Sequence, residues 1–104
     1  MDRKQLAIDF AKSLNYPEIE KIILFGSVAR GDDTTDSDID ILIITKNDGD
    51  RHIIEKDLYK KILDIMIKTG ELISTKIKSI KYYNKYQDFS FFQNVNAEGI
   101  VLKG

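Results

Sequence analysis

Two unbroken apolar runs, with a mostly polar segment between them, constrain the fold of this chain more than any other feature. The runs are Ile22–Phe25 and Ile41–Ile44, and residues 26–40 separate them. A strand that is apolar on both faces is typical of the centre of a sheet with helices on each side. The sequence therefore predicts two central strands, with a polar connection at the rim of the sheet.

Patterns on either side of these runs predict an α/β (α+β) fold, in which helices pack against a small mixed β-sheet. The predicted strands are residues 19–25, 38–45 and 72–77, with an edge strand at 100–102. A first helix capped by Asp2 ends at residues 15–17, a short helix covers 27–30, and a long helix covers 51–69 and ends at Gly70. The segment after Ser79 is helical in pattern and rich in aromatic residues.

Length and composition exclude several classes of protein. The 104 residues are expected to form one domain, 1–104, with no membrane span and no secretory signal, which predicts a cytoplasmic protein. Cysteine is absent and His52 is the single histidine, so thiolate catalysis and histidine-clustered metal sites are not expected. A formal charge of −1 predicts no general binding of nucleic acid.

Four residues around the two apolar runs have the chemistry of a metal and phosphate site. Asp38 and Asp40 are two positions apart at the start of a strand, so both side chains point to the same face. Paired carboxylates of this kind suit Mg²⁺, which prefers hard oxygen ligands and bridges to substrate phosphates. Gly26 and Ser27 stand where a strand leads into a helix, and amide groups at a helix start attract phosphate oxygens.

Taken together, Gly26 and Ser27, ten intervening residues and then Asp38-Ile39-Asp40 resemble the signature of the DNA polymerase β-type nucleotidyltransferase superfamily. The resemblance is to its small members in particular, the minimal nucleotidyltransferases (MNT, MntA-like antitoxins). It implies attack of a hydroxyl on the α-phosphorus of a nucleoside triphosphate, most plausibly ATP, with release of pyrophosphate. One or two Mg²⁺ ions, about 3.5–4 Å apart when paired, neutralise charge in such reactions.

The resemblance also implies roles for single residues. Asp38 and Asp40 match the metal ligands, and Gly26 and Ser27 match the cradle for the terminal phosphates. Arg30 contacts the triphosphate or, equally, pairs with nearby carboxylates to fix the loop.

Catalytic members of the superfamily usually add a third carboxylate from a later strand. Glu71 is the best positional candidate in this chain, and Asp64 is the alternative if the long helix ends earlier than predicted. Some small members lack this residue.

Minimal nucleotidyltransferases often pair with HEPN proteins in toxin-antitoxin systems and add AMP to them. The resemblance therefore implies a HEPN-family partner, a tyrosine hydroxyl as acceptor and an antitoxin role. A second hypothesis is a catalytically weak or inactive nucleotide-binding module that neutralises a partner by binding. Modification of a small molecule is the weaker third, because 104 residues leave no room for a domain that shapes an acceptor pocket.

Overall fold

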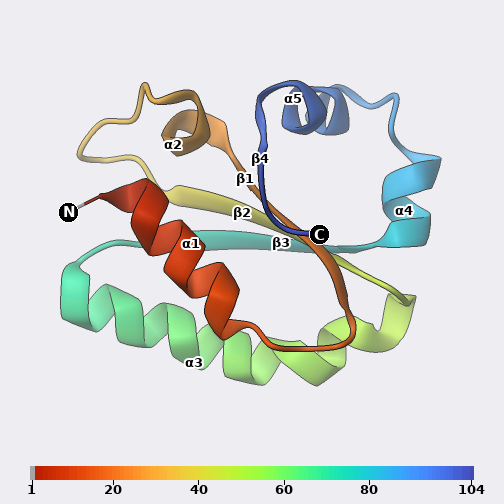
Figure 1. Ribbon diagram of the computed structural model, residues 1–104, viewed down its shortest axis with the longest axis horizontal. Helices are drawn as coiled ribbons and strands as arrows, with labels where there is room; N and C mark the ends of the chain where they lie inside the picture. Colours follow the sequence, from red (N-terminus) through yellow and green to blue (C-terminus); the bar gives the residue numbers. More distant parts are fainter. Residues whose placement is uncertain (1) are drawn as a thin grey trace.

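A four-stranded mixed sheet lies between two groups of helices (Figure 1). The computed structural model describes residues 2–104. The elements in chain order are α1 (Arg3–Ser13), β1 (Ile19–Phe25), α2 (Gly26–Arg30), β2 (Ile39–Thr45), a 3-10 turn (Asp48–Asp50), α3 (Arg51–Thr69), β3 (Ile73–Ser79), α4 (Ile80–Lys85), α5 (Ser90–Glu98) and β4 (Ile100–Lys103).

The sheet has the strand order β3-β2-β1-β4, so the two apolar runs form its centre. β1 is antiparallel to both β2 and β4, whereas β2 and β3 are parallel. The parallel pair needs a long crossover, and α3 provides it. In the register of β1 and β2, Phe25 pairs with Asp40, which brings the end of β1 to the start of β2.

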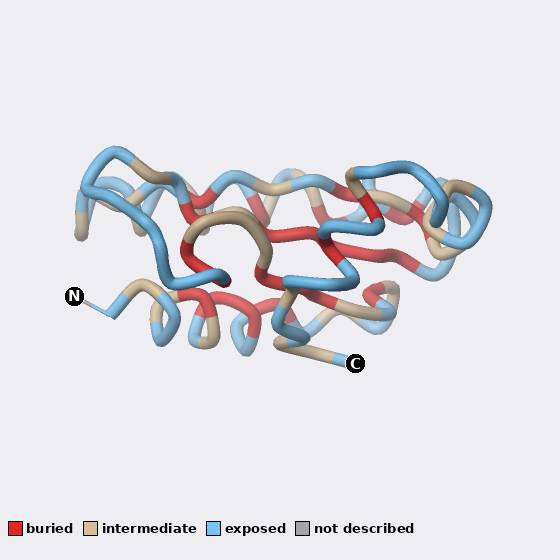
Figure 2. The backbone as a smooth tube through the Cα atoms, turned by 90° about the horizontal axis from the view of Figure 1, so that it is seen from above, coloured by how far each residue is buried: buried red, intermediate tan, exposed pale blue. Residues whose placement is uncertain are grey.

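Helices α1 and α3 cover one face of the sheet and build the larger core. The buried members of this core alternate along the strands with residues of the opposite face. They include Phe10 and Leu14 from α1, Ile22 and Leu24 from β1, Ile39, Ile41 and Ile43 from β2, and Ile54 and Leu58 from α3. In Figure 2 the buried segments run through the middle of the molecule, and exposed loops surround them.

Helices α4 and α5 cover part of the other face with a smaller, aromatic core. Phe92 and Val95 of α5 are buried against Ile23, Leu42 and Ile44 of the central strands. The aromatic segment predicted after Ser79 therefore serves partly as core. Tyr82 and Phe89 are its exposed members, at 39% and 57%.

The α/β fold with a small mixed sheet is confirmed, and most boundaries agree with the sequence patterns. β1 and α3 have the predicted bounds, and the Asp2 side chain caps α1 by accepting hydrogen bonds from the amides of Lys4 and Gln5. β3 runs two residues past its predicted end, to Ser79, because Ile77 and Ser79 remain buried beside β2. Over residues 2–104, no helix is long and apolar enough to span a membrane.

Candidate active site

The turn from β1 into α2 lies directly against the Asp40 side chain. Gly26 follows Phe25, the residue paired with Asp40. Its φ is 75°, a value that residues other than glycine rarely adopt. A Cβ at Gly26 would overlap a carboxylate oxygen of Asp40 and lie 3.2 Å from its Cγ. The glycine is therefore needed twice, once for its backbone conformation and once for this close approach.

Asp40 points to the α4 and α5 side of the sheet, because its neighbours Ile39 and Ile41 belong to the core under α1 and α3. Asp38 comes one residue before β2 and is exposed. Burial raises the pKa of the Asp40 carboxyl, the charge of Asp38 raises this pKa further, and the cations Lys76 and Arg30 lower it in part.

Among residues 2–104, neither Asp38 nor Asp40 forms an ion pair or a hydrogen bond through its side chain. Two neighbouring carboxylates that repel one another and have no protein partner fit a divalent cation. Mg²⁺ commonly binds through one or two carboxylates, with water and substrate phosphates as its other ligands.

Helix α2 places Ser27 one residue after Gly26 in its first turn. This helix has only five residues and ends at Gly31, whose φ of 83° allows the Gly31 amide to donate to the carbonyls of Ser27 and Val28. The Ser27 side chain is partly buried and has no hydrogen-bond partner within residues 2–104. The helix start, the serine hydroxyl and Asp40 therefore all lie at the β1–α2 turn.

Two cations flank this site, and each comes from a different element. Arg30, at the end of α2, donates to Asp32 at 3.2 Å and to Glu98 of α5 at 3.1 Å. Lys76, on β3, lies 5.7 Å from the ring centroid of Phe91 and lowers the pKa of Asp40. Lys76 is exposed and follows Ser74, the residue paired with Asp40, by two positions, so its side chain lies on the Asp40 face of the sheet.

A cavity of about 310 Å³ opens between α2 and α5 beside the glycine turn. Its walls include Gly26 and Arg30 on one side and Phe91, Asn94 and Glu98 on the other. Glu98 lies 68 residues from Arg30 in the chain, so no local sequence pattern could connect them. The cavity extends the site away from the carboxylates and toward the aromatic core.

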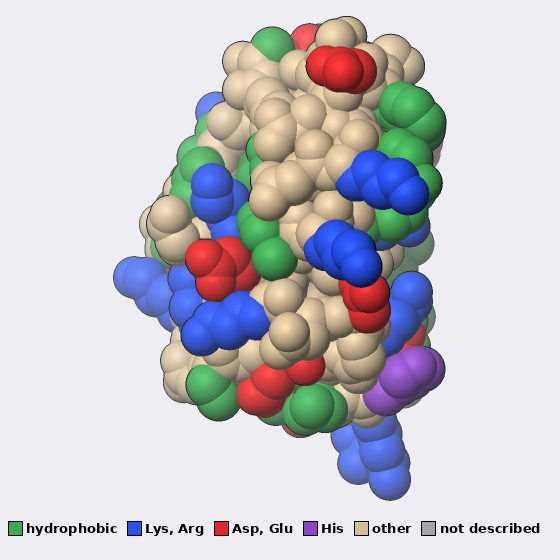
Figure 3. Space-filling model, turned by 90° about the vertical axis from the view of Figure 1, so that its right-hand side faces the viewer, with side chains coloured by type: hydrophobic (Ala, Val, Ile, Leu, Met, Phe, Trp, Pro, Cys, Tyr) green, Lys and Arg blue, Asp and Glu red, His purple; other side chains and the backbone are tan. Residues whose placement is uncertain are grey.

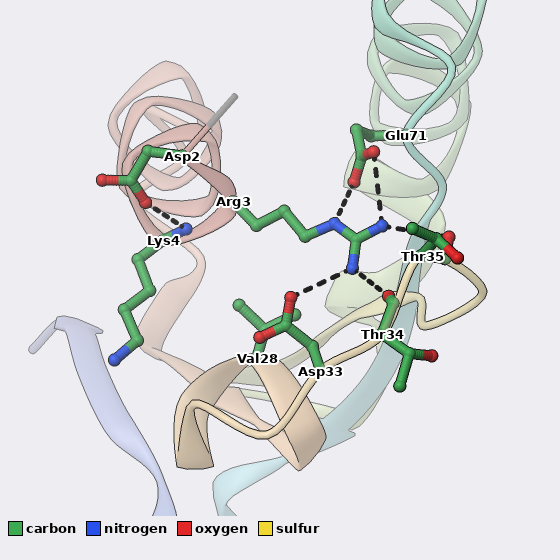
Figure 4. Close-up of a pocket in the computed structure, with 8 residues that line it drawn as sticks. All are labelled: Asp2, Arg3, Lys4, Val28, Asp33, Thr34, Thr35 and Glu71. Atoms are coloured by element: carbon green, nitrogen blue, oxygen red, sulfur yellow. Dashed lines mark hydrogen bonds and ion pairs between the residues drawn. The ribbon is translucent and has the colours of Figure 1, made fainter.

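Glu71, the predicted third carboxylate, lies in a different pocket, which is lined by α1 and the loop after α2 (Figure 4). Its carboxylate accepts from Arg3 Nε at 2.5 Å and from Arg3 Nη2 at 3.4 Å. The same guanidinium donates to Asp33 and to the backbone carbonyls of Thr34 and Thr35. Arg3 therefore connects α1, the loop that leads to Asp38 and the start of β3.

No carboxylate of β3 lies next to Asp40, because the residue that pairs with it is Ser74. Asp64, the alternative, lies within α3, which continues to Thr69, and it is exposed and paired with Lys68 at 3.0 Å. No group of three or more Asp, Glu, His or Cys side chains in residues 2–104 is placed to hold a metal ion. Asp38 and Asp40 are thus the carboxylates that the β1–α2 turn and β2 bring together.

The comparison with known families identifies the class of protein. Residues 8–104 match the polymerase beta nucleotidyltransferase family, so nearly the whole chain, including the site just described, is accounted for. The chain belongs to this family and is a nucleotidyltransferase.

Relatives and solved structures agree with this assignment. A proposed protein adenylyltransferase of Methanocaldococcus jannaschii is 45% identical over 95 residues, which are 91% of this chain and 89% of the relative. A chain in the crystal structure of a toxin-antitoxin pair with AMP-PNP superposes with a TM-score of 0.57 at 21% identity, over 100% of this chain and 74% of that one. A chain in the complex of the tri-AMPylated Shewanella oneidensis HEPN toxin with its MNT antitoxin gives a TM-score of 0.51 at 20% identity, over 100% and 73%.

Replacement of Gly26 by alanine tests the close approach to Asp40. We expect Gly26→Ala to lower the free energy of unfolding by roughly 1–3 kcal/mol, because it adds both backbone strain and a collision with the carboxylate. Gly31→Ala is the matched control, since its φ is also positive but a Cβ there meets nothing within 4 Å. Equal losses in chemical denaturation for the two variants would contradict the contact.

Replacement of Arg3 tests the connection among α1, the loop and β3. We expect Arg3→Ala to lower the melting temperature more than Arg51→Ala, whose pair with Glu55 lies at the surface. Glu71→Gln combined with Arg3→Ala should destabilise less than the sum of the two single changes, because both remove the same interaction. Additive effects in thermal melts would show that Arg3 and Glu71 act separately.

The raised pKa of Asp40 predicts a pH-dependent effect of the Asp40→Asn change. Stability of the wild type falls as pH rises through the range between the usual aspartate pKa and the raised one, because the folded state binds the proton more tightly there. In metal-free buffer, Asp40→Asn should therefore melt higher than wild type at neutral pH. This difference should shrink when melting is measured below the raised pKa, and a constant difference would contradict the assignment.

Proposed function

We propose that this chain transfers AMP from ATP to a hydroxyl group of a partner protein, with Mg²⁺ held by Asp38 and Asp40. The observation that carries the proposal is the contact of the Gly26 turn with Asp40, beside a second carboxylate and with no ion pair to either carboxylate within residues 2–104. The M. jannaschii relative, named as a proposed protein adenylyltransferase, supports a protein acceptor. The structural neighbours, described as a toxin-antitoxin with AMP-PNP and as an MNT antitoxin with a tri-AMPylated HEPN toxin, support ATP and a HEPN partner.

In this reaction the acceptor oxygen forms a bond to the α-phosphorus as the bond from that phosphorus to the bridging oxygen breaks. Pyrophosphate leaves with the bonding electrons, and the proton of the acceptor hydroxyl passes to water. Mg²⁺, when bound, supplies charge neutralisation at the phosphates. Asp38 and Asp40 are the ligands for one or two such ions.

The remaining site residues bind and orient the triphosphate. The Ser27 hydroxyl and the amides at the start of α2 hold the terminal phosphates, and Gly26 keeps the approach to the backbone open. Arg30 and Lys76 add positive charge on two sides, and Glu98 keeps the Arg30 guanidinium at the mouth of the cavity between α2 and α5. The acceptor is a tyrosine of a HEPN toxin, and the transfer makes this chain an antitoxin.

A second candidate function has an observation in its favour. β3 presents Ser74 beside Asp40, and Glu71 is held by Arg3, so a third carboxylate is not part of this arrangement. A site with two carboxylates suits a nucleotide-binding module that neutralises its partner by forming a complex.

The two candidates predict different results for one pair of substitutions. The purified chain is mixed with Mg²⁺, labelled ATP and the product of the neighbouring gene, and label on the partner is measured. We expect Asp38→Asn with Asp40→Asn to reduce transfer to background while the complex still forms, because the substituted site no longer holds the cation.

Label on the partner with the wild type, together with loss of neutralisation in the double variant, supports transfer. Unchanged neutralisation by the double variant, or absence of label with the wild type, contradicts it and favours the binding module.

A further inference from the structure

Positive charge is unevenly distributed in this chain, although its formal charge is only −1. Three shallow pockets adjoin along the outer edge of β3 and the start of α4. The first, of about 210 Å³, shares Arg51, Ile77 and Lys78 with the second, of about 170 Å³. The second shares Asp48 and Tyr82 with the third, of about 160 Å³. We call this continuous feature the basic groove and define it by Arg51, Lys76, Lys78, Lys81, Lys85 and Tyr82.

The lysines of the basic groove have no acidic partners. Within residues 2–104, Lys76, Lys78, Lys81 and Lys85 form no ion pair, and Asp48 is the single acidic residue among the linings of the three pockets. Arg51 is paired with Glu55. Four cations at one side of the chain therefore form no ion pair, although the charge of Lys76 also acts on Asp40, and together they suit an anionic ligand.

Aromatic rings stand between these lysines. Lys78 lies 4.7 Å from the ring centroid of Tyr82, and Lys85 lies 5.3 Å from that of Tyr86. The Tyr82 and Tyr86 rings are themselves 4.5 Å apart, and Tyr82 keeps 39% of its surface exposed. On the end of the molecule that carries α4, basic side chains stand next to hydrophobic ones, with several acidic side chains on the same face (Figure 3).

Protection of an edge strand explains only part of this arrangement. β3 is at the edge of the sheet, and lysines on such strands discourage pairing with another chain. That reason applies to Lys76 and Lys78. It does not apply to Lys81 and Lys85, which lie on α4 and are one helical turn apart.

We propose that the basic groove binds a single-stranded nucleic acid, with phosphates on the four lysines and a base on Tyr82. Phosphates complement the unpaired cations, and the part of the Tyr82 ring that Lys78 and Tyr86 leave exposed provides a stacking surface, a combination typical of single-strand binding. An acidic peptide would complement the lysines but offers no base to stack on the exposed part of the Tyr82 ring. This binding does not depend on the transfer reaction, so it can be tested on the wild-type chain without a partner protein.

The test measures fluorescence anisotropy of short labelled single-stranded RNA and DNA of mixed sequence with the full chain. We expect binding at low salt, about 50 mM. The logarithm of the association constant should fall with the logarithm of the salt concentration at a slope of about −3, because four lysines contact phosphates. Polyglutamate of similar length is the competing anion. Preference of the chain for RNA or for DNA identifies the natural ligand, and binding of either supports the proposal.

Matched variants locate the binding surface. Lys81→Gln with Lys85→Gln should weaken binding roughly tenfold and reduce the slope by about 1.4. Lys56→Gln with Lys60→Gln is the control, because both lysines are exposed, four residues apart on α3 and outside the groove, and the change in charge is the same. Tyr82→Leu should weaken binding roughly fivefold or more through lost stacking, whereas Tyr82→Phe should retain it.

Absence of nucleic-acid binding by the wild type at low salt overturns the proposal. Equal losses in the Lys81/Lys85 and Lys56/Lys60 variants overturn it as well, because they indicate attraction to the whole surface. Tighter binding of polyglutamate than of either nucleic acid assigns the groove to an acidic peptide instead.

Discussion

The antiparallel register of β1 and β2 is the constraint on which the site depends. It pairs Phe25 with Asp40 and so brings the next residue, Gly26, into contact with the carboxylate. A shift by one residue would turn Asp40 toward the core under α1 and α3, where an unpaired carboxylate is costly. The apolar residues that alternate along β2 therefore fix the position of the Asp40 carboxylate as well as the core.

The rest of the fold holds the segments on either side of the β1–β2 pair in place, namely the loop before Asp38 and the end of α2. α1 packs under the sheet and extends Arg3 to Glu71 and to the loop that leads to Asp38 (Figure 4). α5 packs on the opposite face through Phe92 and Val95, and its Glu98 reaches Arg30. Elements that are distant in sequence thus hold both approaches to the β1–α2 turn.

The sequence predicted the elements well because their signals are local. The apolar runs, the Asp2 cap and the Gly70 stop each depend on a few neighbouring residues, and the strands and helices follow them closely. The Gly26, Ser27, Asp38 and Asp40 pattern is likewise contained in one short segment. The proximity of the glycine turn to the aspartates could be predicted because this segment connects two adjacent strands.

Interactions between distant elements could not be predicted in this way. Glu71 was the expected third carboxylate, but its partner Arg3 is 68 residues away, and no periodicity connects them. Lys76 and the basic groove depend on the alternation along β3 and on where α4 packs. The formal net charge of −1 gave no sign of a groove with four lysines that form no ion pair.

In the proposed site, one nucleotide and its cation contact the β1–α2 turn and Asp40 together. Paramagnetic Mn²⁺ in place of Mg²⁺ tests this directly, because it broadens the NMR signals of nearby amides when ATP is added. We expect selective broadening of Gly26, Ser27 and Asp40, with residues of the exposed face of α3 unaffected. Broadening centred on Arg3 and Glu71 instead, or equal broadening throughout the chain, would contradict it.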